Sequence, residues 1–595
     1  MNYTDRKDIP EKYTWDLTLV FKSKDEWNAE YDKLSEDIKA ISDYKGKLSN
    51  RDDALALLQV FFGLEKRIEK LYDYAARISD LDTRDTESSA LVDRISFLLN
   101  TYSTYASYIE PEFTSLSNEQ LDAYIADKDF ENYTRMLEGI KKSKAHVLSE
   151  KEEELMAMAG GALSRYSNIF KMINNADIQF PTVTDDNGKE YKVTHGAYGL
   201  ILAGSDRKLR EKAFKAYYQV FRNNLNTIAA TYSGNVKKDW FYAKARKYNS
   251  CIEQALENEE VPKAVYDNLI NSIHKYNPIM HDYMKLRRDV MGYDELHMWD
   301  MHTAIVDNCE MKMDIEEAEE LVIKALAPLG ADYQELLKNA FSDRWCDIYE
   351  TPGKRSGAYS SGAFGRHPYV LLNYQENLDN VFTIAHELGH AMHSYKSNKA
   401  QCYEKAGYKI FLAEIASTTN EVLLLKYLLS TTEDENMKKM LLAHYVDMFR
   451  TTIFRQSMFA EFEQIAHTME ENGEPLTSKS LSDKYYELNK EYYGPYVVSD
   501  EDIAIEWARI PHFYTPFYVY KYSTGLISAI CIANKILQEG QPMVDKYMKF
   551  LSAGDSMEPI EILKMADVDL TTNAPFDFAF GELEKALEEL KSLMK

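Results

Sequence analysis

Apolar residues recur at intervals of three and four positions along most of the chain, with charged residues between them. The segment DDALALLQVFFGLEKRIEKLYDYAARI (residues 52–78) shows this pattern over many turns. The spacing places the apolar side chains on one face of an α-helix. It dominates from about residue 24 to residue 160, and again from about residue 206 to the C-terminus. We therefore predict a mainly α-helical protein whose N-terminal part is an antiparallel helical lobe.

The first interruption of the helical pattern is IQFPTVTDDNGKEYKVTH (residues 178–195). Two β-rich runs flank Asp186, Asn187 and Gly188, residue types that tolerate positive φ in a tight turn. We therefore predict a β-hairpin at about residues 178–194. A chain of 595 residues is long enough for more than one hydrophobic core. The hairpin separates our two predicted lobes, residues 1–195 and residues 196–595.

The second interruption is SGAYSSGAFGRHPYVLLNYQENLDN (residues 356–380). Its glycines permit an irregular backbone, but no Gly-Lys-Ser/Thr ending follows, which argues against a phosphate-binding loop. Residues 369–373 read as a short strand, and a further helix begins after them. Asn377, Asp379 or Asn380 is the candidate N-cap of that helix.

The composition restricts the classes of function. The formal net charge is −26, so electrostatic repulsion disfavours nucleic acid and anionic membranes as partners. No apolar stretch reaches the length of a transmembrane helix, and the first residues lack the apolar core of a signal peptide. The cysteines form no CxxC pair and are scattered along the chain: Cys251, Cys309, Cys346, Cys402 and Cys531. These features predict a cytoplasmic protein.

The segment VFTIAHELGHAMHSY (residues 381–395) contains the candidate chemistry. In a helix, His386 and His390 lie one turn apart on the same face and can bind one metal ion. Zinc accepts such nitrogen ligands and in catalytic sites leaves one position to water, which Glu387 can deprotonate as general base. His393 lies about 10.5 Å from His386 along the axis and cannot share the ion, so we expect it in the cleft or in support of a ligand. The alternative is a surface helix, but the apolar flanks indicate burial, where an unpartnered His-Glu-His cluster is costly.

The segment FLAEIASTTNEVLLLKYLL (residues 411–429) is a second apolar helix, interrupted by Glu414. A carboxylate on a buried helix requires a cation, so Glu414 is our candidate third ligand. Glu421 follows seven residues later, close to the same face. Two interpretations of Glu421 have equal weight: support for the outer nitrogen of a ligand histidine, or a surface charge.

HELGHAMHSY followed by FLAEIASTTNE resembles the thimet-oligopeptidase-like zinc metallopeptidases, and within them the oligoendopeptidase F group. The resemblance extends to EKYTWDLTLVF, to SGAYSSG with PYVLLNY, and to RIPHFYTPFYVYKYSTG, and so spans nearly the whole chain. It implies a mainly helical fold of the zincin type, with two lobes around a deep channel. An HExxH motif is expected to bind zinc at the channel floor. It also implies substrates that are short, unstructured peptides.

The resemblance also assigns residues. His386, His390 and Glu414 match the metal ligands and Glu387 the general base, whereas Glu404, the rival to Glu414, lacks the FLAEIAS context. A histidine and a following tyrosine stabilise the oxyanion in related enzymes, which points to His512 with Tyr520, or with Tyr518 as second choice. Other aromatic residues of this segment are expected to pack in a core.

We therefore predict a zinc-dependent endopeptidase that hydrolyses internal bonds of oligopeptides by zinc-activated water and Glu387. The substrate backbone is expected to add as a strand against residues 369–373, because edge pairing tolerates many sequences. The net charge favours basic peptides. A zinc exopeptidase and a non-catalytic peptide-binding protein are the alternatives; the first needs a group that holds a free terminus, and the second does not need Glu387.

Overall fold

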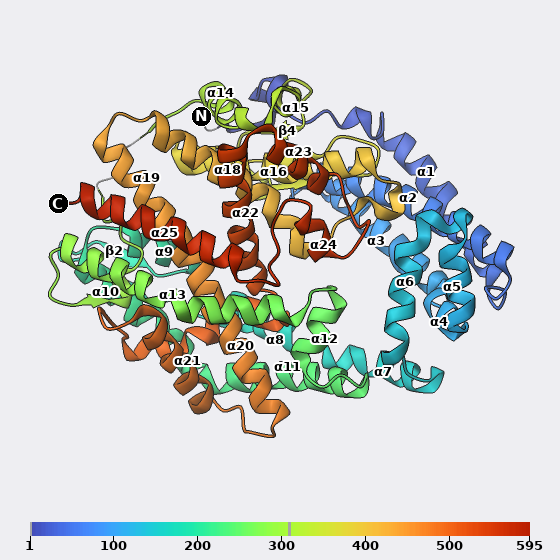
Figure 1. The fold of residues 1–595 in the computed structure, drawn as a ribbon, viewed down its shortest axis with the longest axis horizontal. Coiled ribbons are helices and arrows are strands. Elements are labelled where there is room, and N and C mark those ends of the chain that lie inside the picture. The colour runs from blue at the N-terminus through green and yellow to red at the C-terminus, as the bar shows by residue number, and fades with distance from the viewer. Residues whose placement is uncertain (1–2, 307–310) are drawn as a thin grey trace. The chain divides into compact units, whose positions relative to one another are not determined.

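The computed structural model describes residues 3–306 and 311–595, which form mainly α-helices with seven short strands (Figure 1). The predicted fold class, mainly α with few strands, is confirmed. Cys309, one of the five cysteines discussed above, lies outside the described residues. Among the described residues, no helix is both long enough and apolar enough to cross a membrane.

The chain forms two compact units that are interleaved along the sequence. The first contains Met1–Val147, Glu310–Tyr427 and Ile532–Val568, and the second contains Leu148–Cys309, Leu428–Cys531 and Asp569–Lys595. Our predicted lobes are instead continuous in sequence, with a boundary near residue 195. That division stays a prediction, and the compact units are described separately below.

The first unit holds an N-terminal group of helices and the helices and strands around the HELGH segment. Its N-terminal helices are α1 (Lys24–Asp37), α2 (Arg51–Leu81), α3 (Thr86–Ala106), α4 (Ile109–Ser115), α5 (Asn118–Ala126) and α6 (Thr134–Ser143). The others are α14 (Ile315–Ala325), α15 (Ala331–Ser342), α16 (Leu378–Ala400), α17 (Tyr403–Ala406), α23 (Gln541–Leu551) and α24 (Pro559–Lys564). Helix α18 (Ile410–Thr431) begins in this unit and ends in the second. The predicted antiparallel pattern appears in α2 and α3, which pack along each other. Trp27 is fully buried among these helices, and its indole N–H donates to the C=O of Leu71 (2.9 Å).

A three-stranded sheet in the first unit consists of β4 (Cys346–Asp347), β5 (Tyr359–Ser361) and β6 (Tyr369–Leu371). β6 lies in the middle, parallel to β4 and antiparallel to β5. The predicted strand at residues 369–373 is thus present as the central strand, and β5 forms one edge of the sheet.

The second unit is also mainly helical. Its helices are α7 (Glu150–Leu163), α8 (Arg165–Met172), α9 (His195–Ala203), α10 (Arg207–Asn223), α11 (Leu225–Ala245), α12 (Cys251–Asn258), α13 (Lys263–Val290), α19 (Glu435–Met448), α20 (Arg455–Glu471), α21 (Ser478–Tyr493) and α25 (Ala574–Leu593). Helix α22 (Tyr520–Glu539) begins in this unit and continues into the first. Strands β3 (Leu296–His297) and β7 (Val497–Val498) form a short parallel pair.

The predicted hairpin is confirmed in the second unit. Strands β1 (Thr182–Thr184) and β2 (Glu190–Lys192) pair antiparallel. Gly188 in the connecting turn has φ = +83°, a value that favours glycine. The Asp185 carboxylate accepts hydrogen bonds from the N–H groups of Asn187 and Lys189, both at 2.9 Å, and so fixes the turn.

Candidate metal centre

Helix α16 begins where the sequence predicted. The Asn377 side chain caps it by accepting a hydrogen bond from the Asn380 N–H (2.9 Å). The apolar residues that flank the motif are buried, as expected for a helix inside the protein: Val381, Phe382, Ile384, Ala391 and Met392. His386 and His390 lie on one face of this helix, with their ring centroids 4.8 Å apart.

Glu414 of α18 approaches both histidines. Its Oε2 lies 3.4 Å from Nε2 of His386 and 3.6 Å from Nε2 of His390. Donor atoms about 2.1 Å from a tetrahedral zinc ion are about 3.4 Å apart. Two imidazole nitrogens and a carboxylate oxygen at these separations therefore fit zinc. Among the described residues, these three form the one group of His, Cys, Asp and Glu whose ligand atoms lie close enough to share an ion. The rival Glu404 is not in the group.

The short distance between α16 and α18 depends on Gly389, which lies between the two histidines. A Cβ atom at this position would lie 2.5 Å from Cα of Ser417 and 2.7 Å from the C=O oxygen of Ala416, both in α18. The Asn420 side-chain amide also donates to the C=O of Ala385 (3.0 Å) and joins the two helices. Gly389 therefore lets the backbone that carries Glu414 come within reach of the histidines.

Glu421 contacts the outer nitrogen of a candidate ligand, which confirms the first of its two interpretations. Its Oε1 is hydrogen-bonded to Nδ1 of His386. This bond keeps a proton on Nδ1 and directs Nε2 towards Glu414 and His390, so that Nε2 can bind a metal ion when it gives up its own proton. Burial lowers the pKa of His386, but hydrogen bonds to Glu414 and Glu421 outweigh burial and raise the pKa to about 10. The two carboxylates thus favour a positive charge at this position, which a proton or a metal ion can supply.

Glu387 lies beside the candidate ligands without joining them. Only 7% of its surface is exposed, and its Oε2 is buried without a hydrogen-bond partner among the described residues. Burial raises the pKa of Glu387 to about 7. The charges of Glu414 and Glu421 add to this rise, whereas His386 and the nearby Ser360 N–H oppose it. A buried carboxyl group with a pKa near neutrality is suited to accept and return a proton.

The Ser360 N–H, which opposes the rise in the pKa of Glu387, belongs to an edge strand of the sheet. In β6, the Val370 N–H donates to the C=O of Trp345 (2.7 Å), so Val370 faces β4. Ser360 of β5 lies opposite Val370, and its N–H and C=O therefore point away from β6. This role of β5 was not predicted from the sequence. Three residues are too few to show the alternation of apolar and polar side chains that marks a strand. The only indication of β5 in the sequence is the run AYSS between two glycines.

The predicted docking of substrate against residues 369–373 is wrong. Strand β6 is paired on both sides, by β4 and by β5, so its backbone groups are already used. A short strand can be recognised in a sequence, but its place within a sheet depends on segments far away in the chain. Among the described strands, β4 and β5 form the two edges of this sheet, and β5 is the edge beside Glu387.

His393, which we expected in the cleft or in support of a ligand, is instead a core residue. It is 1% exposed, and its ring stacks on Tyr408 with the centroids 3.7 Å apart. Burial lowers its pKa to about 3, so the imidazole is neutral.

The predicted oxyanion residues belong to the second unit. His512 is partly exposed, and its ring neighbours are Tyr518 (6.0 Å between centroids) and Tyr522 (6.1 Å). Tyr520 is only 1% exposed and packs against Tyr266. The assignment of His512 and Tyr520 stays a prediction, and the exposure of the rings favours Tyr518, the second choice.

Comparison with known proteins places the chain in a family. A family model described as peptidase family M3 matches residues 200–582, and one described as oligopeptidase F matches residues 112–180. The chain belongs to peptidase family M3. It is 44% identical to oligopeptidase PepF of Bacillus subtilis over 592 residues, which are 99% of this chain and 88% of the relative.

Solved structures agree with this assignment. A protein from Chlamydophila abortus is 36% identical, with a TM-score of 0.93 over 99% of this chain and 100% of that one. Oligoendopeptidase-F from Enterococcus faecium is 37% identical, with a TM-score of 0.75 over 96% of this chain and 99% of the other. The M3 match confirms the resemblance found in the sequence and the predicted enzyme class, a metalloendopeptidase. Membership of this family also implies a metal ion.

Proposed function

We propose that the protein is a zinc-dependent endopeptidase that hydrolyses internal bonds of short, unstructured peptides. His386, His390 and Glu414 hold the zinc ion, and Glu387 is the general base. The observation that carries the proposal is the convergence of three ligand atoms with Glu387 beside them, buried but not part of the group. A non-catalytic zinc site has no need of such a carboxyl group and is usually closed by a fourth protein ligand.

Each residue around the site has a defined task. A zinc ion bound here supplies Lewis-acid chemistry, which polarises a carbonyl group and acidifies water. Glu387 accepts a proton from the attacking water and delivers it to the leaving amine. The Ser360 N–H lies near the Glu387 carboxylate and favours its ionised form, and Glu421 fixes the tautomer of His386.

The edge of β5 is the natural place for the peptide backbone. Its outward C=O at Ser360 can accept a hydrogen bond from a peptide that adds as a further strand. Pairing through the main chain accepts many side chains but requires an extended segment, so folded proteins are poor substrates. The same strand contacts Glu387 through Ser360, so a bound peptide lies beside the general base.

The decisive experiment is hydrolysis of an internally quenched peptide, blocked at both ends, by the wild type and by Glu387→Gln, with bound zinc measured in both. We expect the wild type to cleave the peptide, and the variant to bind equal zinc and lose activity. Glu335→Gln, an exposed position on α15, is the matched control for removal of one charge and should remain active. Normal turnover by Glu387→Gln would exclude Glu387 as the base. Failure of the wild type to cleave blocked peptides, with cleavage of free-ended ones, would indicate an exopeptidase.

A further inference from the structure

A small cavity opens in the first unit directly after β5. Its volume is about 170 Å³. Gly362 and Phe364 line it from the segment that follows β5, Ser394 and Asn398 from α16, and Glu69 from α2. Independent small-molecule sites usually measure about 300–1,000 Å³. A cavity of this size suits one side chain, or one end of a longer ligand.

The cavity lies along the same helix face as the metal centre. Ser394 and Asn398 follow His390 at four and eight residues, which is about 6 and 12 Å along the axis of α16. An extended peptide advances about 3.3 Å per residue. A peptide paired with β5 therefore brings to this cavity a residue about two to four positions from the part of the peptide that lies beside His390.

Glu69 lines the cavity, and Glu65 lies near it on the same helix. Glu69 and Glu65 lie one turn apart on α2, and among the described residues neither makes an ion pair. The hydrogen bond to the Glu69 carboxylate comes from the Phe364 N–H and is long (3.4 Å). Lys66, the neighbouring base, places its Nζ over the Phe364 ring at 4.4 Å from the centroid. Two like charges at this spacing repel each other, and partial burial adds to their cost.

The electrostatics of Glu69 agree with this geometry. Burial raises its pKa to about 7, and the charges of Asp73 and Glu65 add to the rise, while the Phe364 N–H and Lys66 oppose it. A cation bound in the cavity would remove the repulsion and keep Glu69 ionised. Tyr403 also lines the cavity, and the face of an aromatic ring attracts a cation.

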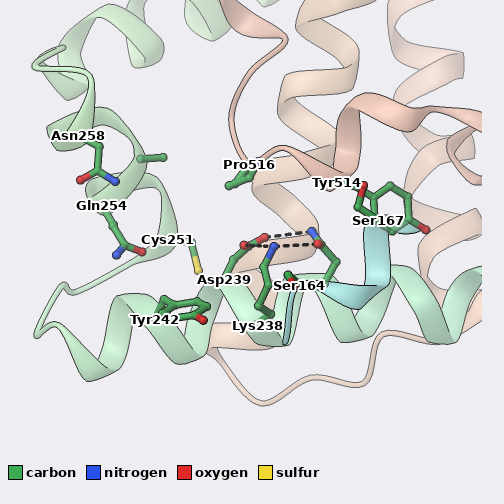
Figure 2. Close-up of a pocket in the computed structure, with 12 residues that line it drawn as sticks. Ser164, Ser167, Lys238, Asp239, Tyr242, Cys251, Gln254, Asn258, Tyr514 and Pro516 are labelled. Atoms are coloured by element: carbon green, nitrogen blue, oxygen red, sulfur yellow. Dashed lines mark hydrogen bonds and ion pairs between the residues drawn. The ribbon is translucent and has the colours of Figure 1, made fainter. Parts of the chain in front are cut away.

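A larger cavity of about 480 Å³ in the second unit makes a useful contrast (Figure 2). Its charged side chains are already paired: Lys238 lies 2.9 Å from Oδ1 of Asn235 and 3.1 Å from Oδ1 of Asp239. Asp239 also contacts His467 at 3.3 Å. Charge at that cavity is compensated within the protein, whereas neither Glu69 nor Glu65 forms an ion pair with any described residue.

We propose that the cavity after β5 is a substrate subsite in which Glu69, supported by Glu65, binds a positively charged group of the peptide. This inference rests on the proposed endopeptidase function. The group is an ammonium or a guanidinium, and it has two sources in a peptide: a lysine or arginine side chain, or the free N-terminus. Glu69 is thus a specificity-determining residue for the same reaction.

The test uses an internally quenched peptide of neutral residues. Lysine replaces norleucine, which has the same chain without the charge, at each of four positions on either side of the cleaved bond. A second pair of peptides differs only by acetylation of the N-terminus. For each pair we measure the ratio of kcat/KM for the charged peptide over the neutral one, with cleavage sites assigned by mass spectrometry. We expect a ratio of about ten or more at one position, or for the free amine, because charge-assisted hydrogen bonds are strong.

Variants then assign the preference to Glu69. In Glu69→Gln the ratio should fall to about one, and in Glu69→Lys below one, while Glu335→Gln, a surface control, keeps the wild-type ratio. A merely structural role of Glu69 would not invert the preference. The proposal is overturned if the wild type cleaves all peptides with equal efficiency, or if Glu69→Gln retains the preference. The wild-type comparison needs no variant and stands even if a variant fails to fold. Absence of any cleavage would instead overturn the proposed function.

Discussion

Gly389→Ala tests whether the close approach of α16 and α18 builds the metal centre. A Cβ atom at this position would lie 2.5 Å from Cα of Ser417 and 2.8 Å from its backbone nitrogen. Non-bonded carbon atoms are normally about 3.5–4.0 Å apart, so the helices must separate by about 1 Å. Overpacking of this kind costs about 1–3 kcal/mol. Helix propensity acts in the opposite direction, because alanine is favoured over glycine by about 1 kcal/mol.

The separation also moves Glu414 away from His386 and His390. Zinc-ligand distances tolerate changes of only about 0.2 Å, so a shift of about 1 Å weakens the third ligand. We expect zinc affinity to fall at least about tenfold, the lower limit found for changes that disturb ligand position. The assays are competition with a chelator for zinc affinity, and thermal unfolding of the metal-free protein.

Two matched controls separate the contact from helix propensity. Gly63 in α2 and Gly139 in α6 also lie within helices, and a Cβ atom at either position meets no atom within 4 Å. Alanine there should raise the unfolding temperature or leave it unchanged, with zinc affinity intact. A Gly389→Ala protein with wild-type zinc affinity, and at least wild-type Tm, would refute the argument from the contact.

Three further outcomes follow from the site. Glu421→Gln should lower zinc affinity about 10–100-fold, because the Nδ1–H of His386 no longer donates to a carboxylate. Unchanged affinity would exclude a role of Glu421 in supporting this ligand. If exposure decides the oxyanion donor, Tyr518→Phe lowers kcat about 10²–10³-fold and Tyr520→Phe changes mainly stability; the reverse result would support our first choice, Tyr520. The lysine preference should rise as the pH increases through about 7, where Glu69 ionises, and a preference independent of pH between 6 and 8 would count against that carboxyl group.

Features that depend on residues close together in the sequence could be predicted. The spacing of His386 and His390, the cap at Asn377 and the apolar surroundings of Glu414 each depend on a few neighbouring residues in one helix. The hairpin turn around Gly188 is equally local. Helical periodicity also sufficed for the mainly α fold, because it repeats over many turns.

Features that depend on distant segments could not be predicted. The pairing of β6 on both sides joins three segments, and its residues look the same whether the strand lies at an edge or in the centre. The tyrosines near His512 were ranked without knowledge of the backbone: α22 begins only at Tyr520, so helical spacing does not relate Tyr518 to it. Glu69 lies almost 300 residues from β5 in sequence, and its charge looks like any other on an amphipathic helix until the fold brings the two together.

The cavity and the edge strand together make the direction of the bound peptide measurable. Strand β5 runs from Tyr359 towards Gly362 and the Glu69 cavity. A peptide antiparallel to β5 therefore places residues on the N-terminal side of the cleaved bond beside Glu69, and a parallel peptide places residues on the C-terminal side there. Because antiparallel pairing is slightly more stable per residue, we expect the lysine preference on the N-terminal side, and only this polarity lets a free N-terminus reach Glu69. A Glu69-dependent preference on the C-terminal side would still support the subsite, but it would show that the peptide binds parallel to β5.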